Sequence, residues 1–154
     1  MTTTVHYGSL VIPLAAQRRV DEAFGYLARD ASLRSIVERL ERSPVEHRIG
    51  INHRHVDSYQ SSNHTIRWDP TSALRTSGGG RQSPALGLAH ELDHAAENDD
   101  TYRRLQNERV PGYDSAEERR VITGSERHAA HTLHESVRYD HRGRVYRVAG
   151  PTQR

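Results

Sequence analysis

The segment from Ser83 to Glu97 constrains the fold of this chain more than any other part of the sequence. Ser83 is a residue type that caps helices, Pro84 suits the first helical position, and residues 85–97 are rich in helix formers. Apolar side chains recur along the segment and offer surfaces for packing: Leu86, Leu88, Ala89, Leu92 and Ala95. We therefore predict a central helix that ends at residues 98–100.

Periodicity predicts further helices on both sides of this one. Apolar residues at spacings of three and four indicate two helices within residues 13–43, separated at Asp30–Ser32, with Ser32 as the N-cap of the second. A second long helical pattern runs from Ser115 to about Glu135, and we expect a short helical turn at Arg103–Gln106.

Short strands complete the predicted elements. Ile49 and Ile51 alternate with polar residues, Asn63–Trp68 offers a second short strand, and Arg144–Val148 alternates again, as a strand or an ordered arm. The polar segment between the first two strands suits a turn. We expect an extended peptide to pair with Asn63–Trp68 as an added strand.

The predicted architecture is a single α+β domain over residues 1–154, with helices packed on a small β-sheet. We expect flexible ends at residues 1–12 and 149–154. Residues 75–82 contain three consecutive glycines and are expected to form a flexible loop, which is either a flap over a cleft or a plain linker.

The amino-acid composition excludes several classes of protein for this chain. The chain lacks cysteine, which excludes disulfides and thiolate zinc sites. Its longest apolar run, Leu10–Ala16, is too short to span a membrane and lacks the preceding basic stretch of a signal peptide. The net charge is only +2, with 22 basic residues, all arginine, dispersed among 20 acidic ones, so we expect neither a membrane nor a nucleic acid as partner.

The central helix carries the motif His90-Glu91-Leu92-Asp93-His94. Residues four apart lie one turn apart on the same helix face, so both imidazoles can bind one ion. Glu91 lies about 100° further round, where its carboxylate can act on water at the metal without being a ligand. We predict one zinc ion per chain, with His90 and His94 as ligands and Glu91 as the catalytic base.

Catalytic zinc usually takes a third protein ligand and keeps one position for water. The leading candidate is Glu118, which follows His94 by 24 residues and lies at the start of the second long helical pattern. Ser115 and Glu118 also have the spacing of a capping box, which is compatible with metal ligation. Three other carboxylates are alternative third ligands: Glu117, Glu126 and Asp100.

Other polar residues are candidates for supporting roles. His128, His131 and His134 follow one another at spacings of three, as solvent-exposed helix residues or with one of them supporting the metal site. Besides the metal, the oxyanion formed during hydrolysis needs a hydrogen-bond donor. The candidates for that donor are Tyr139, Tyr146 and His131.

An ordered series of motifs resembles a known family. An Ile-x-Trp-Asp-Pro element at residues 66–70 and a glycine-containing loop precede Pro-Ala-Leu-Gly-Leu-Ala-His-Glu-Leu-Asp-His-Ala, which begins at Pro84. This series resembles the NleD-type effector zinc metalloproteases that Gram-negative pathogens inject into host cells. The downstream Glu-Glu-Arg-Arg-Val-Ile, with Glu126 eight residues after Glu118, is similar to that family's second block. The family usually has Ala-Val-Gly and Glu-Asn where this chain has residues 121–124 and Glu126-Arg127.

The resemblance covers about residues 45–135 and implies more than the motif alone. It implies a zincin-like fold, a gluzincin-type site with Glu118 in the block that carries the third zinc ligand, and cleavage of a protein substrate in a host or target cell. It further implies a virulence effector that is made in the bacterial cytoplasm and secreted without a signal peptide, as by type III secretion. We expect a monomer.

Two other functions are compatible with the sequence. A non-catalytic, zinc-stabilised protein-interaction module would complete the metal coordination with a fourth protein ligand from the three helix histidines. An arginine-rich nucleic-acid-binding protein is the third hypothesis, although no aromatic platform accompanies the arginines.

Overall fold

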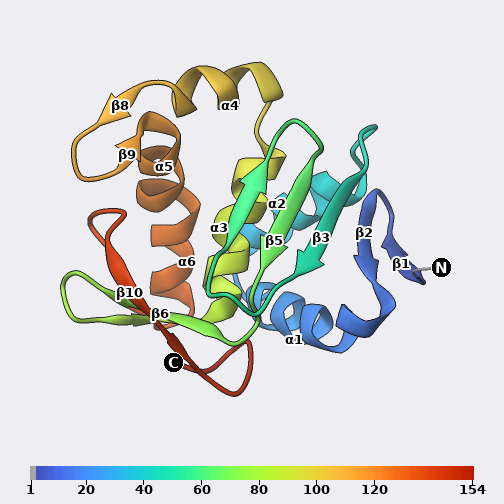
Figure 1. Cartoon of the computed structure of the whole chain (residues 1–154), viewed down its shortest axis with the longest axis horizontal. Coiled ribbons are helices and arrows are strands. Elements are labelled where there is room, and N and C mark those ends of the chain that lie inside the picture. Colours follow the sequence, from blue (N-terminus) through green and yellow to red (C-terminus); the bar gives the residue numbers. More distant parts are fainter. Residues whose placement is uncertain (1–2) are drawn as a thin grey trace.

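The computed structural model describes residues 3–154, which form an α+β arrangement of helices with a mixed and an antiparallel sheet (Figure 1). The larger sheet has the strand order β1-β2-β3-β5-β4, and its strands are β1 (Thr4–Tyr7), β2 (Leu10–Pro13), β3 (His47–Ile51), β4 (Ser58–Gln60) and β5 (Thr65–Trp68). The second sheet has the order β10-β6-β7, and its strands are β6 (Ser72–Thr76), β7 (Arg81–Gln82) and β10 (Gly143–Arg147). A short ribbon pairs β8 (Arg109–Val110) with β9 (Asp114–Ser115).

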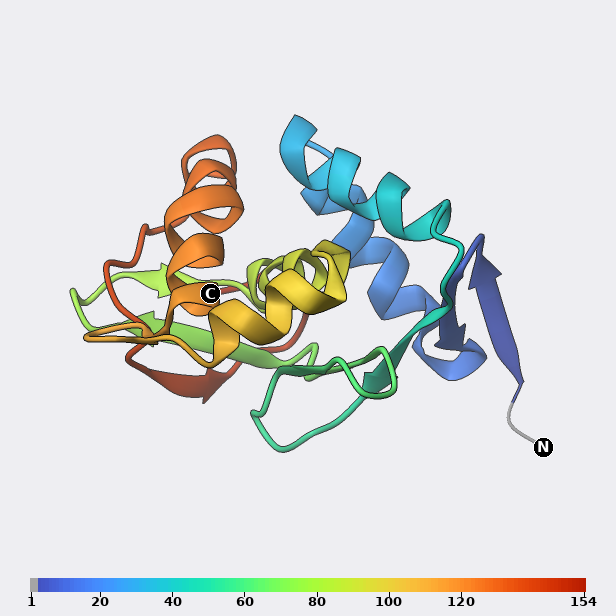
Figure 2. The same cartoon turned by 90° about the horizontal axis from the view of Figure 1, so that it is seen from above.

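The helices gather around one central member. They are η1 (Leu14–Ala16), α1 (Gln17–Leu27), α2 (Ala31–Glu41), α3 (Pro84–Ala96), α4 (Asp99–Gln106), α5 (Ala116–Val121), η2 (Ile122–Glu126) and α6 (Arg127–Thr132). Seen from above, α2 and the α5–α6 column lie on one side of α3 and the sheets on the other (Figure 2). The central helix predicted from the sequence is therefore confirmed.

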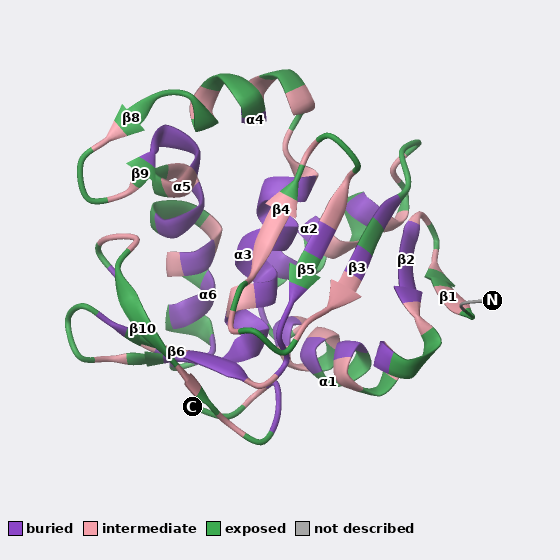
Figure 3. Cartoon of the chain, in the orientation of Figure 1, coloured by how far each residue is buried: buried purple, intermediate pink, exposed green. Residues whose placement is uncertain are grey.

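Helix α3 begins and packs as its residues dictate. The Ser83 hydroxyl caps it by accepting a hydrogen bond from the Leu86 N–H at 3.3 Å. The helix contacts α1, α2 and α5, strands β4 and β5 of the larger sheet, and strand β6 of the smaller one. Because these elements pack around it, even the ionisable residues of its motif are buried (Figure 3). The Trp68 indole N–H donates to the Pro84 carbonyl at 2.8 Å and fixes the start of α3 against β5.

The two N-terminal helices are confirmed, with one correction at their junction. The break lies between Leu27 and Ala31, but Asp30 rather than Ser32 is the N-cap of α2. Asp30 has an extended backbone, and its carboxylate accepts the Leu33 N–H at 3.0 Å. Ser32 lies inside the helix and donates its hydroxyl to the same carboxylate at 2.5 Å.

The strands near Ile49 and Ile66 are confirmed, but the prediction for the edge of the sheet was wrong. Strand β5 lies between β3 and β4, so both of its sides are already paired and it cannot accept an added peptide strand. The edge strand on this side of the sheet is β4, inside the polar segment that we expected to be a turn.

Residues 75–82 form a hairpin instead of an irregular loop. Strand β6 continues to Thr76, β7 occupies residues 81–82, and Leu74 and Arg75 pair with Gln82 and Arg81. The turn is closed by the Thr76 N–H, which donates to the Gly80 carbonyl at 2.8 Å.

The chain ends also differ from the prediction. Residues 4–13 form the β1–β2 hairpin of the larger sheet, whereas residues 1–2 of the predicted flexible end lie outside the described part of the chain. At the other end, the Pro151 carbonyl accepts the Ala85 N–H at 2.8 Å, and the Arg154 guanidinium donates to the His134 carbonyl at 2.8 Å. The strand predicted around residues 144–148 is confirmed as β10.

The second long helical pattern is confirmed in outline but is not a regular helix. It consists of α5, the π-helical segment η2 and α6, with the non-helical Gly124 (φ −102°, ψ −108°) inside η2. Helical structure ends at Thr132, three residues before the predicted end. The expected turn at residues 103–106 is the second half of α4, which starts at Asp99 behind an Asn98 cap.

Candidate metal centre

Three side chains from two elements converge at the centre of the molecule. The Nε2 atoms of His90 and His94 lie 3.0 Å apart, and Glu118 Oε2 lies 2.7 Å from the first and 3.2 Å from the second. His90 and His94 come from successive turns of α3, and Glu118 from the first turn of α5. These three residues form a group that could hold a metal ion.

The outer nitrogen of each imidazole is bound by a buried carboxylate. His90 Nδ1 lies 2.9 Å from Glu126 Oε1, and His94 Nδ1 lies 2.7 Å from Glu117 Oε2. An ionised carboxylate only accepts hydrogen bonds, so each Nδ1 donates and each Nε2 presents a lone pair to the centre. Two lone pairs and a carboxylate oxygen would repel one another at these distances unless a positive charge lay among them. The donor set therefore fits a cation.

The pKa values follow the same electrostatics. Burial disfavours the charged form of His90, but the hydrogen bonds to Glu118 and Glu126 outweigh it and raise the His90 pKa to about 10. Burial likewise opposes ionisation of Glu118, yet the two imidazoles hold the pKa of its carboxyl far below the usual range. In the absence of a metal, a proton supplies the positive charge that the cluster requires.

Two arginines neutralise the outer carboxylates. Arg138 donates from Nε and Nη2 to Glu126 at 2.8 and 2.7 Å. Arg120 donates to Glu117 at 2.8 Å and to Asp93 Oδ1, on α3, at 2.9 Å. A buried charge without a partner is strongly destabilising. The ion pairs with the two arginines therefore offset the free-energy cost of burying the carboxylates behind the histidines.

The π-helical segment explains how Glu118 and Glu126 both reach His90. Eight residues in a regular α-helix turn about 80° beyond two full turns, which would point the two carboxylates in different directions. One extra residue in a π segment removes most of this offset. Both carboxylates therefore face α3, one on each side of the His90 ring.

The remaining carboxylate of the motif faces an open cleft. Glu91 is only 7% exposed and accepts no hydrogen bond from any residue between 3 and 154. It lines a cleft of about 320 Å³ together with His90, Asp57 and His141. Burial raises the pKa of Glu91, against the effect of the two nearby imidazoles.

Asp57 forms a further wall of this cleft. Its Oδ1 accepts the Asp69 N–H at 2.8 Å. Gly87, one turn before Glu91, leaves room for the other carboxylate oxygen, because a Cβ at this position would lie 2.7 Å from Asp57 Oδ2. Burial is the main cause that raises the pKa of Asp57 to about 7, and the negative charge of Glu91 adds to it.

His141 is the closest functional group that sequence reasoning missed. Its Nδ1 lies 2.5 Å from Asp114 Oδ2, its Nε2 lies 3.4 Å from Glu118 Oε2, and its ring stacks on His90 at a centroid distance of 6.1 Å. Asp57, Asp114 and Arg138 were missed as well. None of the four lies in a periodic pattern or at a recognisable spacing from the motif, so the only available signal was the residue types themselves.

Several candidates from the sequence lie away from the centre. Asp100 has a 91% exposed side chain and pairs with Arg103. His128 pairs with Asp30 at 2.7 Å, and Tyr139 is 71% exposed beside the Arg127 guanidinium. Three further residues are not brought into the metal-binding group or the cleft lining: His131, His134 and Tyr146.

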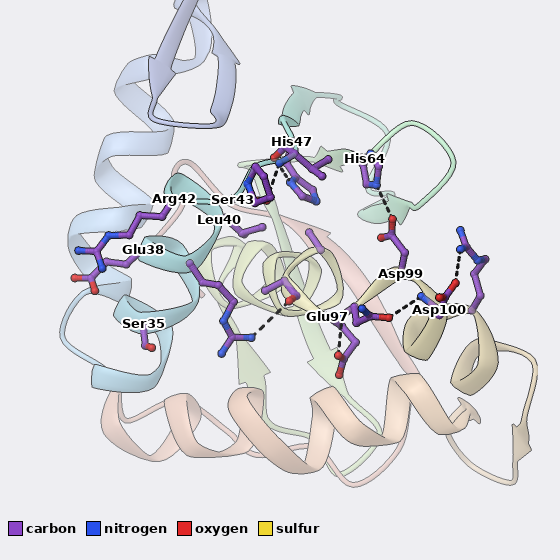
Figure 4. Close-up of a pocket in the computed structure, with 17 residues that line it drawn as sticks. Ser35, Glu38, Leu40, Arg42, Ser43, His47, His64, Glu97, Asp99 and Asp100 are labelled. Atoms are coloured by element: carbon purple, nitrogen blue, oxygen red, sulfur yellow. Dashed lines mark hydrogen bonds and ion pairs between the residues drawn. The ribbon is translucent and has the colours of Figure 1, made fainter.

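A second and larger cavity, of about 900 Å³, lies between the ends of α2 and α3 and the start of α4 (Figure 4). None of the metal-centre residues lines it. Some ionisable groups there pair with one another, as His64 Nε2 does with Asp99 Oδ2 at 2.9 Å. We therefore place the candidate site in the smaller cleft, where ionisable groups converge.

No protein-family model, curated protein or solved structure matches this chain. Within the described residues, no helix combines the length and apolar character needed to cross a membrane.

Proposed function

We propose that this chain is a zinc-dependent endopeptidase with a zincin-like fold. The observation that carries the proposal is the combination of a three-residue metal-binding group with a buried carboxylate, in the adjoining cleft, to which no described residue donates a hydrogen bond. Catalytic zinc sites in proteins have three protein ligands and one open position, whereas structural sites are closed by four.

In this proposal, His90, His94 and Glu118 hold the ion, and Glu117 and Glu126 orient the two imidazoles from behind. A bound zinc ion would polarise a water molecule and lower its pKa toward neutrality. Glu91 accepts the proton of the attacking water and delivers it to the leaving amine. The raised pKa of this buried carboxyl suits a group that must both accept and return a proton.

His141 takes the electrophilic role for which we considered Tyr139, Tyr146 and His131. The Asp114 carboxylate holds Nδ1 of His141, and the opposite nitrogen lies at the metal-binding group. Because the Asp114 carboxylate takes the Nδ1–H, this role requires the doubly protonated imidazole of His141, whose Nε2–H would stabilise the negative charge that develops on the scissile carbonyl oxygen.

The substrate is a polypeptide bound in an extended conformation. The edge strand β4 begins directly after Val56 and Asp57, which line the cleft, so an added strand on this edge would pass beside the reacting groups. Val56 and Val145 are 58% and 50% exposed and lie in the cleft lining, where they offer apolar contacts to substrate side chains.

The biological setting rests on the resemblance to NleD-type proteases. We propose a monomeric effector that is secreted by a bacterium and acts on a protein of a host or target cell. Proteomic comparison of cells that receive the parent protein or its Glu91→Gln variant tests this setting, because only the parent should generate new protein termini.

The enzymatic proposal is tested with a proteome-derived peptide library. We expect the zinc-loaded protein to cleave peptides, and Glu91→Gln to keep about one zinc per chain while losing at least 100-fold in rate. Glu46→Gln is the matched control, because Glu46 is exposed and, within residues 3–154, pairs only with Arg48. Cleavage by Glu91→Gln at the parental rate would refute the mechanism, and no cleavage by the zinc-loaded parent would refute the function.

A further inference from the structure

We propose that the smaller sheet carries a binding site for a phosphoryl group, formed by Arg75, Arg81 and Arg144 together with the Tyr146 hydroxyl. Arg144 on β10 pairs in register with Arg75 on β6, and Arg75 pairs with Arg81 on β7. Side chains at paired positions of neighbouring strands project from the same face of a sheet, and the strands lie about 4.8 Å apart. The three guanidinium groups therefore form one row across the whole sheet.

This row borders a surface hollow of about 490 Å³, whose lining consists of the three arginines, Val145 and Tyr146. Tyr146 lies two residues after Arg144 in the same strand, so it shares the arginine face. Leu74 and Val145, at the alternate positions, line the proposed active-site cleft. The hollow and the cleft are thus built on the same strands.

The positive charge of the row has no compensation within residues 3–154. No carboxylate forms an ion pair with any of the three guanidinium groups there, whereas Arg120 and Arg138 at the metal centre are both paired. Like charges directly opposite each other in a sheet are destabilising. Arginines on the edge strands β7 and β10 could serve only to prevent edge-to-edge association, but Arg75 lies on the central strand. The row is therefore best explained by an anion that binds it.

Tyr146 provides a second, independent indication of a ligand. Its hydroxyl is buried and has no hydrogen-bond partner within the described chain. Arg81 lies over its ring, with the guanidinium carbon 5.8 Å from the ring centroid. Buried polar groups in folded proteins are nearly always hydrogen-bonded, so this hydroxyl is a donor in need of an acceptor.

The charge and donor count favour a phosphate monoester. It carries nearly two negative charges and three strong acceptor oxygens at neutral pH, and guanidinium groups bind such oxygens in a bidentate manner. A single carboxylate would leave most of the row uncompensated. Nucleic acids bind along longer cationic tracks, and this row is only three residues wide. We therefore assign the site to a phosphorylated side chain of a partner protein.

The site itself stands on the strand register and the unpaired charges. Its use as a docking point that holds a phosphorylated substrate near the cleft rests on the proposed peptidase function. A binding assay separates the two, because it requires no catalytic turnover.

The test is fluorescence anisotropy with a labelled Gly-Ser decapeptide that carries one central phosphoserine. We expect saturable binding by the parent protein, at least tenfold weaker binding by Arg75→Gln, Arg81→Gln and Arg144→Gln, and an unchanged affinity for Arg104→Gln. Arg104 is the matched control because it is exposed on α4 and makes no ion pair with a described residue. The unphosphorylated peptide should not bind, and inorganic phosphate should compete.

Tyr146→Phe supplies a readout that a purely structural role would not give. Removing a buried hydroxyl that has no partner among residues 3–154 should leave the melting temperature unchanged or higher, yet phosphopeptide binding should weaken severalfold. Absence of saturable binding, equal losses in Arg104→Gln and Arg75→Gln, or tighter binding of a twelve-residue oligothymidylate than of the phosphopeptide would each overturn the proposal.

Discussion

Three glutamates from one short segment make different contacts with the same pair of histidines. Glu118 lies between the two Nε2 atoms, whereas Glu117 and Glu126 bind the opposite ring nitrogens. A carboxylate on the inner side supplies a ligand, and one on the outer side orients the ring and raises its basicity. Replacing each glutamate should therefore have a different consequence for metal binding.

We expect Glu118→Ala to lose stoichiometric zinc on desalting, because one of three ligands is removed. Glu126→Ala should retain the ion with an affinity reduced about 10–100-fold, the usual effect of removing an outer partner. Metal analysis of the purified variants, with chelator competition to obtain affinities, measures both. Equal zinc content in the two variants would show that Glu118 is not the ligand.

Asp57 should make the stability of the metal-free protein depend on pH. Its folded-state pKa of about 7 exceeds the ordinary value of 3.8, so this carboxyl binds more protons in the folded state than in the unfolded chain between these values. The stability that Asp57 contributes is therefore greatest below this window and is lost as the pH rises through 7, by at most about 4 kcal/mol.

The measurement is urea unfolding at pH 5 and pH 8 in the presence of a chelator. Asp57→Asn keeps an oxygen that accepts the Asp69 N–H but removes the ionisation. We expect the variant to lose less stability between the two pH values than the parent protein. The same loss in both proteins would mean that Asp57 does not titrate in this window.

At the residue scale, the sequence predicted the motif histidines because their spacing alone places them on one helix face. It also named Glu117, Glu118 and Glu126 as candidate ligands, but it did not show which of them is a ligand and which bind the outer nitrogens of the imidazoles. That division depends on the π-helical segment, which no periodicity indicates. His141 and Asp57 reach the cleft only through the packing of distant segments, so no sequence pattern selects them.

Among the elements, the segment from α5 to α6 shows most directly how local geometry controls the site. The π segment η2 brings Glu126 onto the face that already carries Glu118. Deleting Gly124 should restore a regular helix and rotate Glu126 by about 100° away from His90.

We expect this deletion to weaken zinc binding about as much as Glu126→Ala does, with the helical circular dichroism signal retained. Thr123→Ala is the control, because it changes an exposed side chain in the same segment and keeps the segment length. Parental zinc affinity in the deletion variant would show that the π segment does not position Glu126.

Elements whose own residues contain clear signals, such as a cap or an apolar period, were predicted well. Elements that form only by pairing with a distant strand were not. Helix α3 has an N-cap residue, a proline in the first position and helix-forming residues, and all three signals indicate a helix in the same place. The β6–β7 hairpin lacks such signals, since its Ser-Gly-Gly-Gly turn has the composition of a flexible linker and β7 has only two residues. Strand β4 has only three residues and is stabilised by pairing with β5. So short a segment carries no recognisable alternation of apolar and polar residues that would predict a strand.

For the whole molecule, the main feature is that C-terminal residues complete a site built on a central helix. Strand β10 pairs with β6, and the segment between α6 and β10 carries Arg138 and His141 to the histidines of α3. The α+β class could be predicted from the order of helical and alternating patterns. The division into two sheets could not, because it depends on which distant strands pair.

The central claim is that the metal-binding group is open to the cleft beside Glu91. The most direct test is a crystal structure of the zinc-loaded protein with an anomalous difference map at the zinc edge. We expect one peak bound by Nε2 of His90 and His94 and by the Glu118 carboxylate, with a water as the fourth ligand in reach of Glu91. A peak elsewhere, or a fourth position filled by His141 or another side chain of the protein, would contradict it.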